Sequence, residues 1–214
     1  MGIHNYFKSL SDLEQLFRLP GKFKYQSHNV AAHSFKVTKI AQFLATIEEL
    51  EGMEVNWRAL YEKALNHDYA ELFTGDIKTP VKYATKELKD LFSQVEEQMA
   101  KKFVEQEFPE ELQGIYLERF KEGKDDTLEG RILSVADKID LLYESFGEIL
   151  KRNPEPLFLE IYKEALSTIM EFSDLNCVKY FIKNILPDML SEEFIPYNEL
   201  NYMTEMIVKK YEKK

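Results

Sequence analysis

Cysteine, glycine and proline are scarce in this chain of 214 residues, which contains one Cys, eight Gly and seven Pro. The single thiol, Cys177, has no partner for an internal disulfide, which is typical of a reducing compartment, so we expect a cytoplasmic location. Because no His lies near it in the sequence, Cys177 is interpreted as a core thiol and not as a nucleophile. The shortage of Gly and Pro favours long helices over short strands and turns.

Long apolar runs and excess positive charge are also missing. No segment approaches the roughly 20 apolar residues that span a bilayer, and the N-terminus lacks the basic and apolar regions of a secretory leader. We therefore expect no membrane partner. The 28 Lys and Arg residues against 38 Asp and Glu give a net charge of −10, which disfavours a nucleic-acid polymer as partner. A small anionic substrate needs only a few well-placed cations.

Bulky hydrophobic side chains are plentiful, with 15 Phe and 12 Tyr in a chain that is 44% hydrophobic. The length is about one and a half times the usual 150-residue domain, and no linker is visible, so we expect a single domain over residues 1–214. Hydrophobic residues recur at steps of three and four, which predicts an all-α bundle of seven to nine helices. The expected helices lie near residues 3–17, 30–44, 57–71, 88–103, 109 onward, 128–150, 158–169, 178–190 and 197–211. The segment 128–150 is apolar on two faces, which predicts a central helix buried from two sides.

Polar residues interrupt the hydrophobic stripes at three places: His33, the adjacent pair His67 and Asp68, and Asp137. A single core-facing His is more often a hydrogen-bonded structural residue than a ligand. Together, however, two imidazoles and two carboxylates on separate helices form a ligand set for a divalent cation if they converge. The chain has only four His, which favours one metal ion over two.

The order of these residues resembles the signature of the HD-domain metal-dependent phosphohydrolases. The flanking residues resemble the bacterial 5′-deoxynucleotidase (YfbR-like) branch of that superfamily, and the motifs cover about residues 15–145, leaving the C-terminal helices 156–214 outside. The motifs are Arg18, residues 29–34, the stretch HDYAELFTGD at 67–76, TPVKY at 79–83, and residues 136–138. The combination of HDxxExxTGD and TPVKY is more specific than the HD signature alone.

The resemblance implies one divalent cation, with cobalt, manganese or another transition metal preferred and magnesium or zinc as alternatives. Its implied ligands are His33, His67, Asp68 and Asp137. Glu71 would position and deprotonate the attacking water, Asp76 would assist proton transfer and Arg18 would grip the phosphate. Members of this branch remove the 5′-phosphate from deoxyribonucleoside monophosphates and are homodimers.

The expected site has two further features. Glu71 follows His67 by four residues, so on the expected helix 57–71 the two side chains would share one face. The loop after this helix, with Asp76, would offer Lys78, Thr79 and Lys82 to the substrate phosphate, although a solvated basic loop is an equally good interpretation. At the ribose, Leu19 stands where the branch often has Trp, a ring that can crowd the 2′ position. Selectivity for deoxyribose therefore stays open.

These observations predict a metal-dependent phosphomonoesterase that acts on the 5′-phosphate of deoxyribonucleoside or ribonucleoside monophosphates. One alternative is a phosphodiesterase or nucleoside triphosphohydrolase on the same scaffold. Another is a non-catalytic helical module that binds nucleotides, in which the metal is structural. The presence of Glu71 and Asp76 favours the enzyme, because a structural site has no use for a free base.

Overall fold

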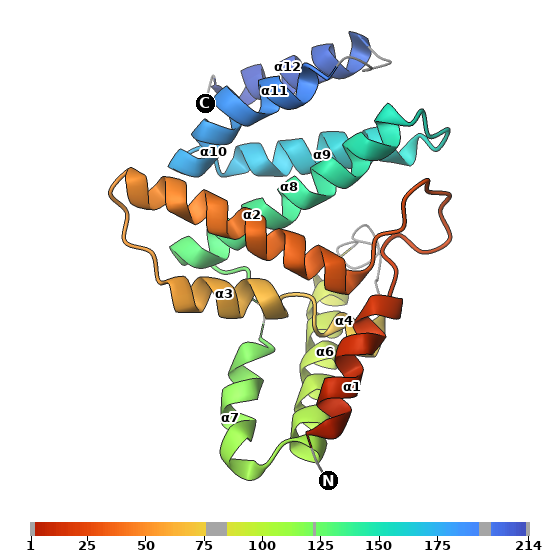
Figure 1. The fold of residues 1–214 in the computed structure, drawn as a ribbon, viewed down its shortest axis with the longest axis vertical. Coiled ribbons are helices and arrows are strands. Elements are labelled where there is room, and N and C mark those ends of the chain that lie inside the picture. The colour runs from red at the N-terminus through yellow and green to blue at the C-terminus, as the bar shows by residue number, and fades with distance from the viewer. Residues whose placement is uncertain (1–2, 76–84, 122, 193–197, 213–214) are drawn as a thin grey trace. The chain divides into compact units, whose positions relative to one another are not determined.

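A computed structural model describes residues 3–75, 85–121, 123–192 and 198–212 (Figure 1). Within these ranges all regular secondary structure is helical, apart from an isolated bridge between Phe17 and Asn29. With α10, η1 and α11 taken as one segment and the four-residue α4 set aside, the described residues form nine helices, so the all-α prediction is confirmed for this part of the chain. The elements are α1 (His4–Gln15), α2 (Val30–Leu50), α3 (Trp57–Asn66), α4 (Glu71–Thr74), α6 (Lys86–Glu107), α7 (Glu110–Arg119), α8 (Leu128–Leu150), α9 (Leu157–Glu171), α10 (Asn176–Tyr180), the π-helical η1 (Phe181–Ile185), α11 (Leu186–Leu190) and α12 (Asn198–Glu212).

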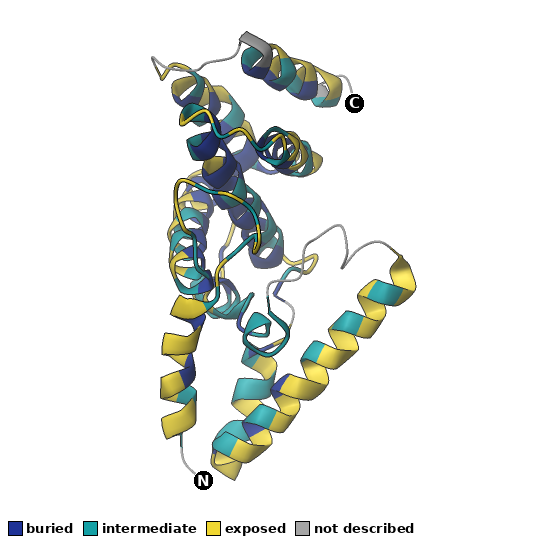
Figure 2. Cartoon of the chain, turned by 90° about the vertical axis from the view of Figure 1, so that its right-hand side faces the viewer, coloured by how far each residue is buried: buried dark blue, intermediate teal, exposed yellow. Residues whose placement is uncertain are grey.

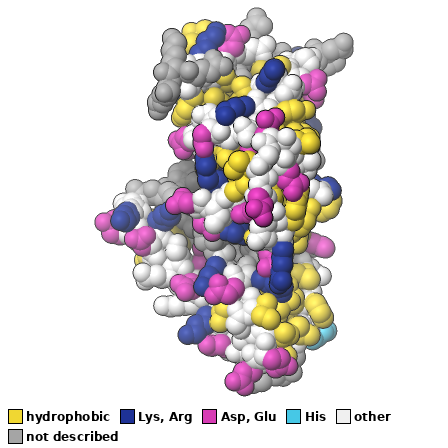
Figure 3. Space-filling model, turned by 90° about the vertical axis from the view of Figure 1, so that its left-hand side faces the viewer, with side chains coloured by type: hydrophobic (Ala, Val, Ile, Leu, Met, Phe, Trp, Pro, Cys, Tyr) yellow, Lys and Arg dark blue, Asp and Glu magenta, His cyan; other side chains and the backbone are white. Residues whose placement is uncertain are grey.

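The surface of the described residues is mixed in charge. Figure 3 shows basic side chains interspersed with acidic ones on the face turned to the viewer, and the described side chains of that face form no extended basic area. Among the described helices, none combines the length and the apolar character that crossing a membrane requires.

Contacts between α-carbons divide the chain into two compact units. The first comprises residues 1–22, 27–35 and 62–124, and the second comprises residues 23–26, 36–61 and 125–214. The expectation of one domain over residues 1–214 stays a prediction.

The core of the first unit is rich in aromatic side chains. Helix α6 contacts α1, α4 and α7, and the buried residues where they meet include Tyr69, Phe108 and Phe120. The half-buried Tyr6 ring of α1 lies 5.0 Å from the ring of Phe108. Figure 2 shows that α6 alternates exposed bands with buried or half-buried ones, as an amphipathic helix does. Large rings thus form a substantial part of this core.

The core of the second unit is built on α8, as its two apolar faces predict. Helix α8 contacts α9, which contacts α12, and Figure 2 shows α8 mostly buried. The Thr127 hydroxyl accepts a hydrogen bond from Gly130 N at 3.1 Å and caps the start of α8. Cys177 is fully buried and burial raises the pKa of its thiol, so the prediction of a core thiol is confirmed.

A buried carboxylate near the end of α8 holds the loop that precedes α2. Glu148 is 1% exposed and accepts hydrogen bonds from Tyr25 N at 3.0 Å, Gln26 N at 2.9 Å and Asn153 Nδ2 at 2.6 Å. Burial on its own would raise the pKa of Glu148, but these donors more than offset it and lower the pKa below its ordinary value of 4.5.

We expect Glu148→Gln to lower the free energy of unfolding by about 1–3 kcal/mol at pH 7, because an amide cannot accept hydrogen bonds at both of its ends. In the unchanged chain this contribution is complete above the unfolded pKa and is lost as the pH falls below 4.5 through the lowered folded value. Urea unfolding at pH 7 and at acid pH measures both effects, with the exposed Glu164→Gln on α9 as control. An equal loss of unfolding free energy in Glu148→Gln and Glu164→Gln would contradict the stabilising role of Glu148.

Candidate metal centre

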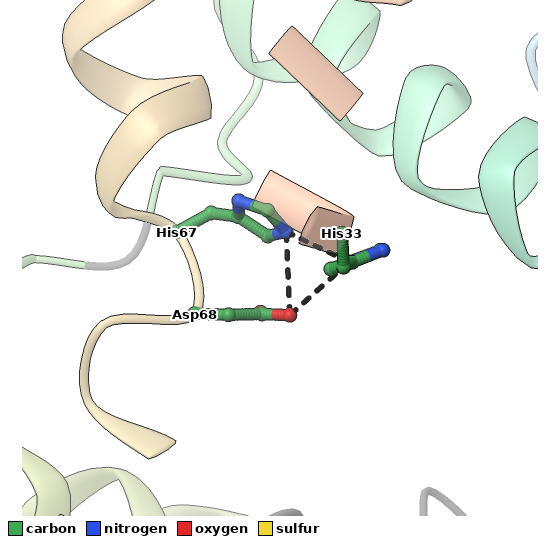
Figure 4. Close-up of side chains that lie close together, drawn as sticks. All are labelled: His33, His67 and Asp68. Atoms are coloured by element: carbon green, nitrogen blue, oxygen red, sulfur yellow. Dashed lines mark hydrogen bonds and ion pairs between the residues drawn. The ribbon is translucent and has the colours of Figure 1, made fainter. Parts of the chain in front are cut away.

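Three of the predicted ligands converge in the first unit (Figure 4). His33 Nε2 lies 3.2 Å from both His67 Nε2 and Asp68 Oδ2, and His67 Nε2 lies 3.3 Å from the same carboxylate oxygen. Both imidazoles are fully buried, whereas the Asp68 side chain is 13% exposed. Two nitrogens and one oxygen therefore face a common point, and of the three side chains only that of Asp68 is partly exposed.

The geometry of this group fits a divalent transition-metal ion. Such ions hold nitrogen and oxygen ligands at about 2.1 Å, which places neighbouring ligands about 3.0–3.4 Å apart for angles between a right angle and a tetrahedral one. The three observed separations, 3.2 to 3.3 Å, lie in that interval. His67 Nδ1 lies 2.8 Å from Ala64 O, and because a carbonyl only accepts, Nδ1 carries the proton. The lone pair of His67 Nε2 is thereby directed to the group, as metal binding requires.

The charge of Asp68 suits the same role. Burial alone would raise the pKa of this carboxyl, but the neighbouring imidazoles, His67 first and then His33, hold it well below its usual range. Arg18 Nη1 also donates to Asp68 Oδ2 at 3.3 Å. Asp68 is therefore an ionised acceptor at neutral pH, which is the form that binds a metal.

The adjacent pair His67 and Asp68 does not lie in a helix, and this corrects the prediction of one helix over residues 57–71. Helix α3 ends at Asn66, residues 67–70 form turns, and α4 begins at Glu71. The hydrogen bonds here span three residues instead of four: Tyr69 N donates to Asn66 O at 3.0 Å and Glu71 N donates to Asp68 O at 3.1 Å. Because the helix is interrupted at residues 67–70, Glu71 and His67 share no helix face. The tighter turn instead places Tyr69 in the aromatic core.

Backbone pairing places Arg18 beside the start of α2, which carries His33. Around the bridge between Phe17 and Asn29, Arg18 N donates to His28 O and Val30 N donates to Leu16 O, both at 2.9 Å. The Asn29 side chain accepts from Ala32 N at 2.8 Å and caps this helix. This isolated bridge and its two hydrogen bonds fix the backbone of Arg18, whose guanidinium contacts Asp68.

The remaining predicted residues are distributed differently. Leu19 adopts a left-handed backbone, with φ of 52°, which costs a non-glycine residue about 1–2 kcal/mol. Asp137 is 5% exposed on α8, in the second unit, and lies 3.6 Å from Lys138 Nζ. Its role as the fourth ligand stays a prediction. The other four predicted site residues lie outside the described residues: Asp76, Lys78, Thr79 and Lys82.

Sequence reasoning missed the partners of the turn that carries the ligands. Tyr69 follows Asp68 directly, and its hydroxyl lies 2.6 Å from the buried Ser9 Oγ of α1. Neither residue breaks a hydrophobic stripe in the way that His33 does. The signal that could have pointed to Tyr69 is the density of aromatic residues between 103 and 120, which predicts a local aromatic core.

Comparisons with known proteins identify a matching family and a similar protein. The profile of the family described as 5′-deoxynucleotidase YfbR-like matches residues 5–189. A 5′-deoxynucleotidase YfbR from Escherichia coli O1:K1 / APEC is 29% identical over 184 residues, which make up 86% of this chain and 90% of that protein.

Solved structures extend the likeness to the fold. The crystal structure of an HD-domain phosphohydrolase from Listeria innocua is 64% identical, with a TM-score of 0.93, and the match covers 98% of this chain and 100% of that one. A protein from Pyrococcus horikoshii OT3 shares the fold at 23% identity and a TM-score of 0.65, over 87% of this chain and 97% of that one. The HD-type helical fold predicted from the sequence is confirmed.

Proposed function

This chain belongs to the YfbR-like 5′-deoxynucleotidase family and is a phosphohydrolase, and from that premise we propose that it is a metal-dependent phosphomonoesterase. Its proposed substrates are nucleoside 5′-monophosphates, deoxyribonucleotides among them, from which it removes the phosphate. The observation that carries the proposal is the convergence of His33, His67 and Asp68 within 3.3 Å of one another. A nucleotide carries a negative charge that a cation at this group would attract and offset.

The proposed metal is one divalent transition-metal ion, cobalt or manganese, with magnesium or zinc as alternatives. When bound, such an ion supplies a water of lowered pKa and neutralises charge on a phosphoryl oxygen. His33, His67 and Asp68 would hold it, and Asp137 is the proposed fourth ligand. Arg18 donates to Asp68 Oδ2 at 3.3 Å, and its guanidinium is the proposed cation that grips the phosphate.

The proton transfers are assigned to two carboxylates. Glu71 begins α4, three residues after Asp68, and is half-buried, which suits a base that removes a proton from the attacking water. Asp76, in the motif after it, is the proposed donor to the leaving oxygen, and Lys78, Thr79 and Lys82 are proposed phosphate contacts. In the same proposal the enzyme is a homodimer, on the ground of the family resemblance. It is also cytoplasmic, on the ground of its single cysteine.

A panel of nucleotides tests the reaction. The protein, loaded with Mn²⁺ or Co²⁺, is incubated with paired ribonucleoside and deoxyribonucleoside mono-, di- and triphosphates and with cyclic dinucleotides. We expect inorganic phosphate from the monophosphates. Pyrophosphate or tripolyphosphate as product would instead assign a triphosphohydrolase, and cleavage of the cyclic dinucleotides a phosphodiesterase. No product from any of them would leave the non-catalytic nucleotide-binding module.

We expect Leu19→Trp to increase the ratio of kcat/KM for deoxyribonucleotides over ribonucleotides by about tenfold, because a bulky ring beside the 2′ position rejects the hydroxyl by crowding. Paired kinetics with one base in both sugar forms measure the ratio. Leu19→Met changes the shape of the side chain without adding a ring and serves as the control. An unchanged ratio in Leu19→Trp would place this side chain away from the ribose.

A further inference from the structure

The turn that carries His67 and Asp68 is stabilised mainly by the packing of its own residue Tyr69 in the aromatic core of the first unit. Residues 67–70 form turns, in which Tyr69 N donates to Asn66 O at 3.0 Å and Leu72 N donates to Tyr69 O at 3.1 Å. Such a short turn has little conformational stability of its own and depends on tertiary contacts. In this turn the residue that makes the most extensive core contacts is Tyr69, which is 4% exposed.

The ring of Tyr69 is fixed by aromatic neighbours from other elements. It stacks on Phe120 with ring centroids 4.2 Å apart and planes inclined by 8°. The Phe73 ring meets it edge-on at 6.1 Å, and the Phe103 ring of α6 lies at 6.2 Å. Stacked and edge-on pairs of this kind are favourable beyond the area that they bury, so the plane of the Tyr69 ring is well determined.

The tip of the ring is fixed by a hydrogen-bond chain with a defined direction. Ser9 Oγ donates its one proton to Tyr6 O at 2.7 Å. The 2.6 Å contact between Ser9 and Tyr69 must therefore run from the Tyr69 hydroxyl to Ser9 Oγ. Ser9 is itself buried, at 4% exposure, so this bond lies in the low-dielectric interior, which strengthens it. The chain ends on the backbone of α1.

We infer that Tyr69 is a positioning residue for the metal centre: its anchored ring fixes the backbone of Asp68, and with it the carboxylate that must meet the two imidazoles. The inference rests on the proposed metal-dependent function. Consecutive α-carbons are about 3.8 Å apart, so a shift of the Tyr69 backbone is passed directly to Asp68. A binding site tolerates displacements of only about 0.5 Å. The Tyr69 ring lies in the aromatic core and its hydroxyl bonds to Ser9, so we expect it to act on metal affinity and not on the chemical step.

Mn²⁺ titrations followed by electron paramagnetic resonance of the free ion test this inference. We expect Tyr69→Leu to raise the Kd for Mn²⁺ by about tenfold or more, as the loss of outer partners of ligands does elsewhere. Tyr69→Phe, which keeps the ring and loses only the bond to Ser9, is expected to raise it by about threefold. At saturating Mn²⁺ the phosphatase kcat of both variants is expected to return close to that of the unchanged chain.

Tyr116→Leu is the matched control, because Tyr116 belongs to the same aromatic core and its ring centroid lies 5.9 Å from that of Phe120, yet it is distant in sequence from the ligands. It is expected to lower Tm as Tyr69→Leu does and to leave the Kd for Mn²⁺ within about twofold of that of the unchanged chain.

Equal Kd values for the unchanged chain and the Tyr69 variants would overturn the inference alone. No Mn²⁺ binding by the unchanged chain would overturn the metal site and the inference with it. If Tyr69→Leu does not fold, the Kd for Mn²⁺ is measured for Tyr69→Phe and Ser9→Ala instead. An unchanged Kd in both of these variants overturns the inference.

Discussion

Asp68→Asn is expected to weaken Mn²⁺ binding by at least about 100-fold and to lower phosphatase activity by about 1000-fold or more, the largest effect of any single change. Asp68 supplies the negative charge in a group whose other two members, His33 and His67, are imidazoles. The two imidazoles hold the pKa of this carboxyl well below its usual range, so the charge is present throughout the neutral range. Asn keeps the shape but carries no charge, and it removes the carboxylate that Arg18 Nη1 contacts at 3.3 Å.

Equilibrium dialysis for Mn²⁺ and phosphate release from deoxyribonucleoside monophosphates measure the two effects. Asp90→Asn removes one carboxylate from the exposed side of α6 and is the control for net charge. It should bind Mn²⁺ and hydrolyse substrate as the unchanged chain does. If Asp68→Asn retained metal at full stoichiometry and normal affinity, the group of His33, His67 and Asp68 would not be the metal centre.

Glu71→Gln is expected to lower kcat by about 100- to 10,000-fold while Mn²⁺ affinity and KM stay nearly constant. The carboxylate of Glu71 is the proposed acceptor of the proton from the attacking water. An amide of the same size preserves the packing at the start of α4 and cannot take up a proton at neutral pH. The result would separate an enzyme from a module with a structural metal.

Initial rates at saturating metal, together with the same dialysis, decide the outcome for Glu71. Glu97→Gln, on an exposed position of α6, is the matched control and should leave kcat unchanged. Unaltered turnover in Glu71→Gln would assign the base to another residue or favour the non-catalytic module. Loss of the metal together with turnover would make Glu71 a ligand instead of a base.

The helices follow from patterns that are local in the sequence. Steps of three and four place α8 within residues 128–150 with apolar faces on two sides, and this helix is buried as expected. Asn29 precedes the stripe of α2 and caps it. Such signals act over a few residues, because capping and amphipathic burial depend on the nearest one or two turns of helix.

The same reasoning fails at residues 67–70, where the stripe continues but the helix does not. The hydrophobic pattern shows only that His67 and Glu71 are four residues apart, whereas the energy of stacking Tyr69 on Phe120 comes from a residue fifty-one positions away. Burial of a large ring in an aromatic core outweighs the loss of one or two helical hydrogen bonds. A pattern in the local sequence does not include the energy of this long-range packing.

By itself the sequence determined the helical class, most of the helix positions and the family, and it predicted four side chains as metal ligands, of which three converge. It did so because hydrophobic spacing, caps and rare polar residues in core stripes are properties of short segments. The tertiary structure alone decided that His33, His67 and Asp68 meet within 3.3 Å, that Arg18 pairs with Asp68, and that a turn anchored by Tyr69 presents the pair. Those relations join residues up to sixty positions apart, and packing between elements is the physical force that fixes them.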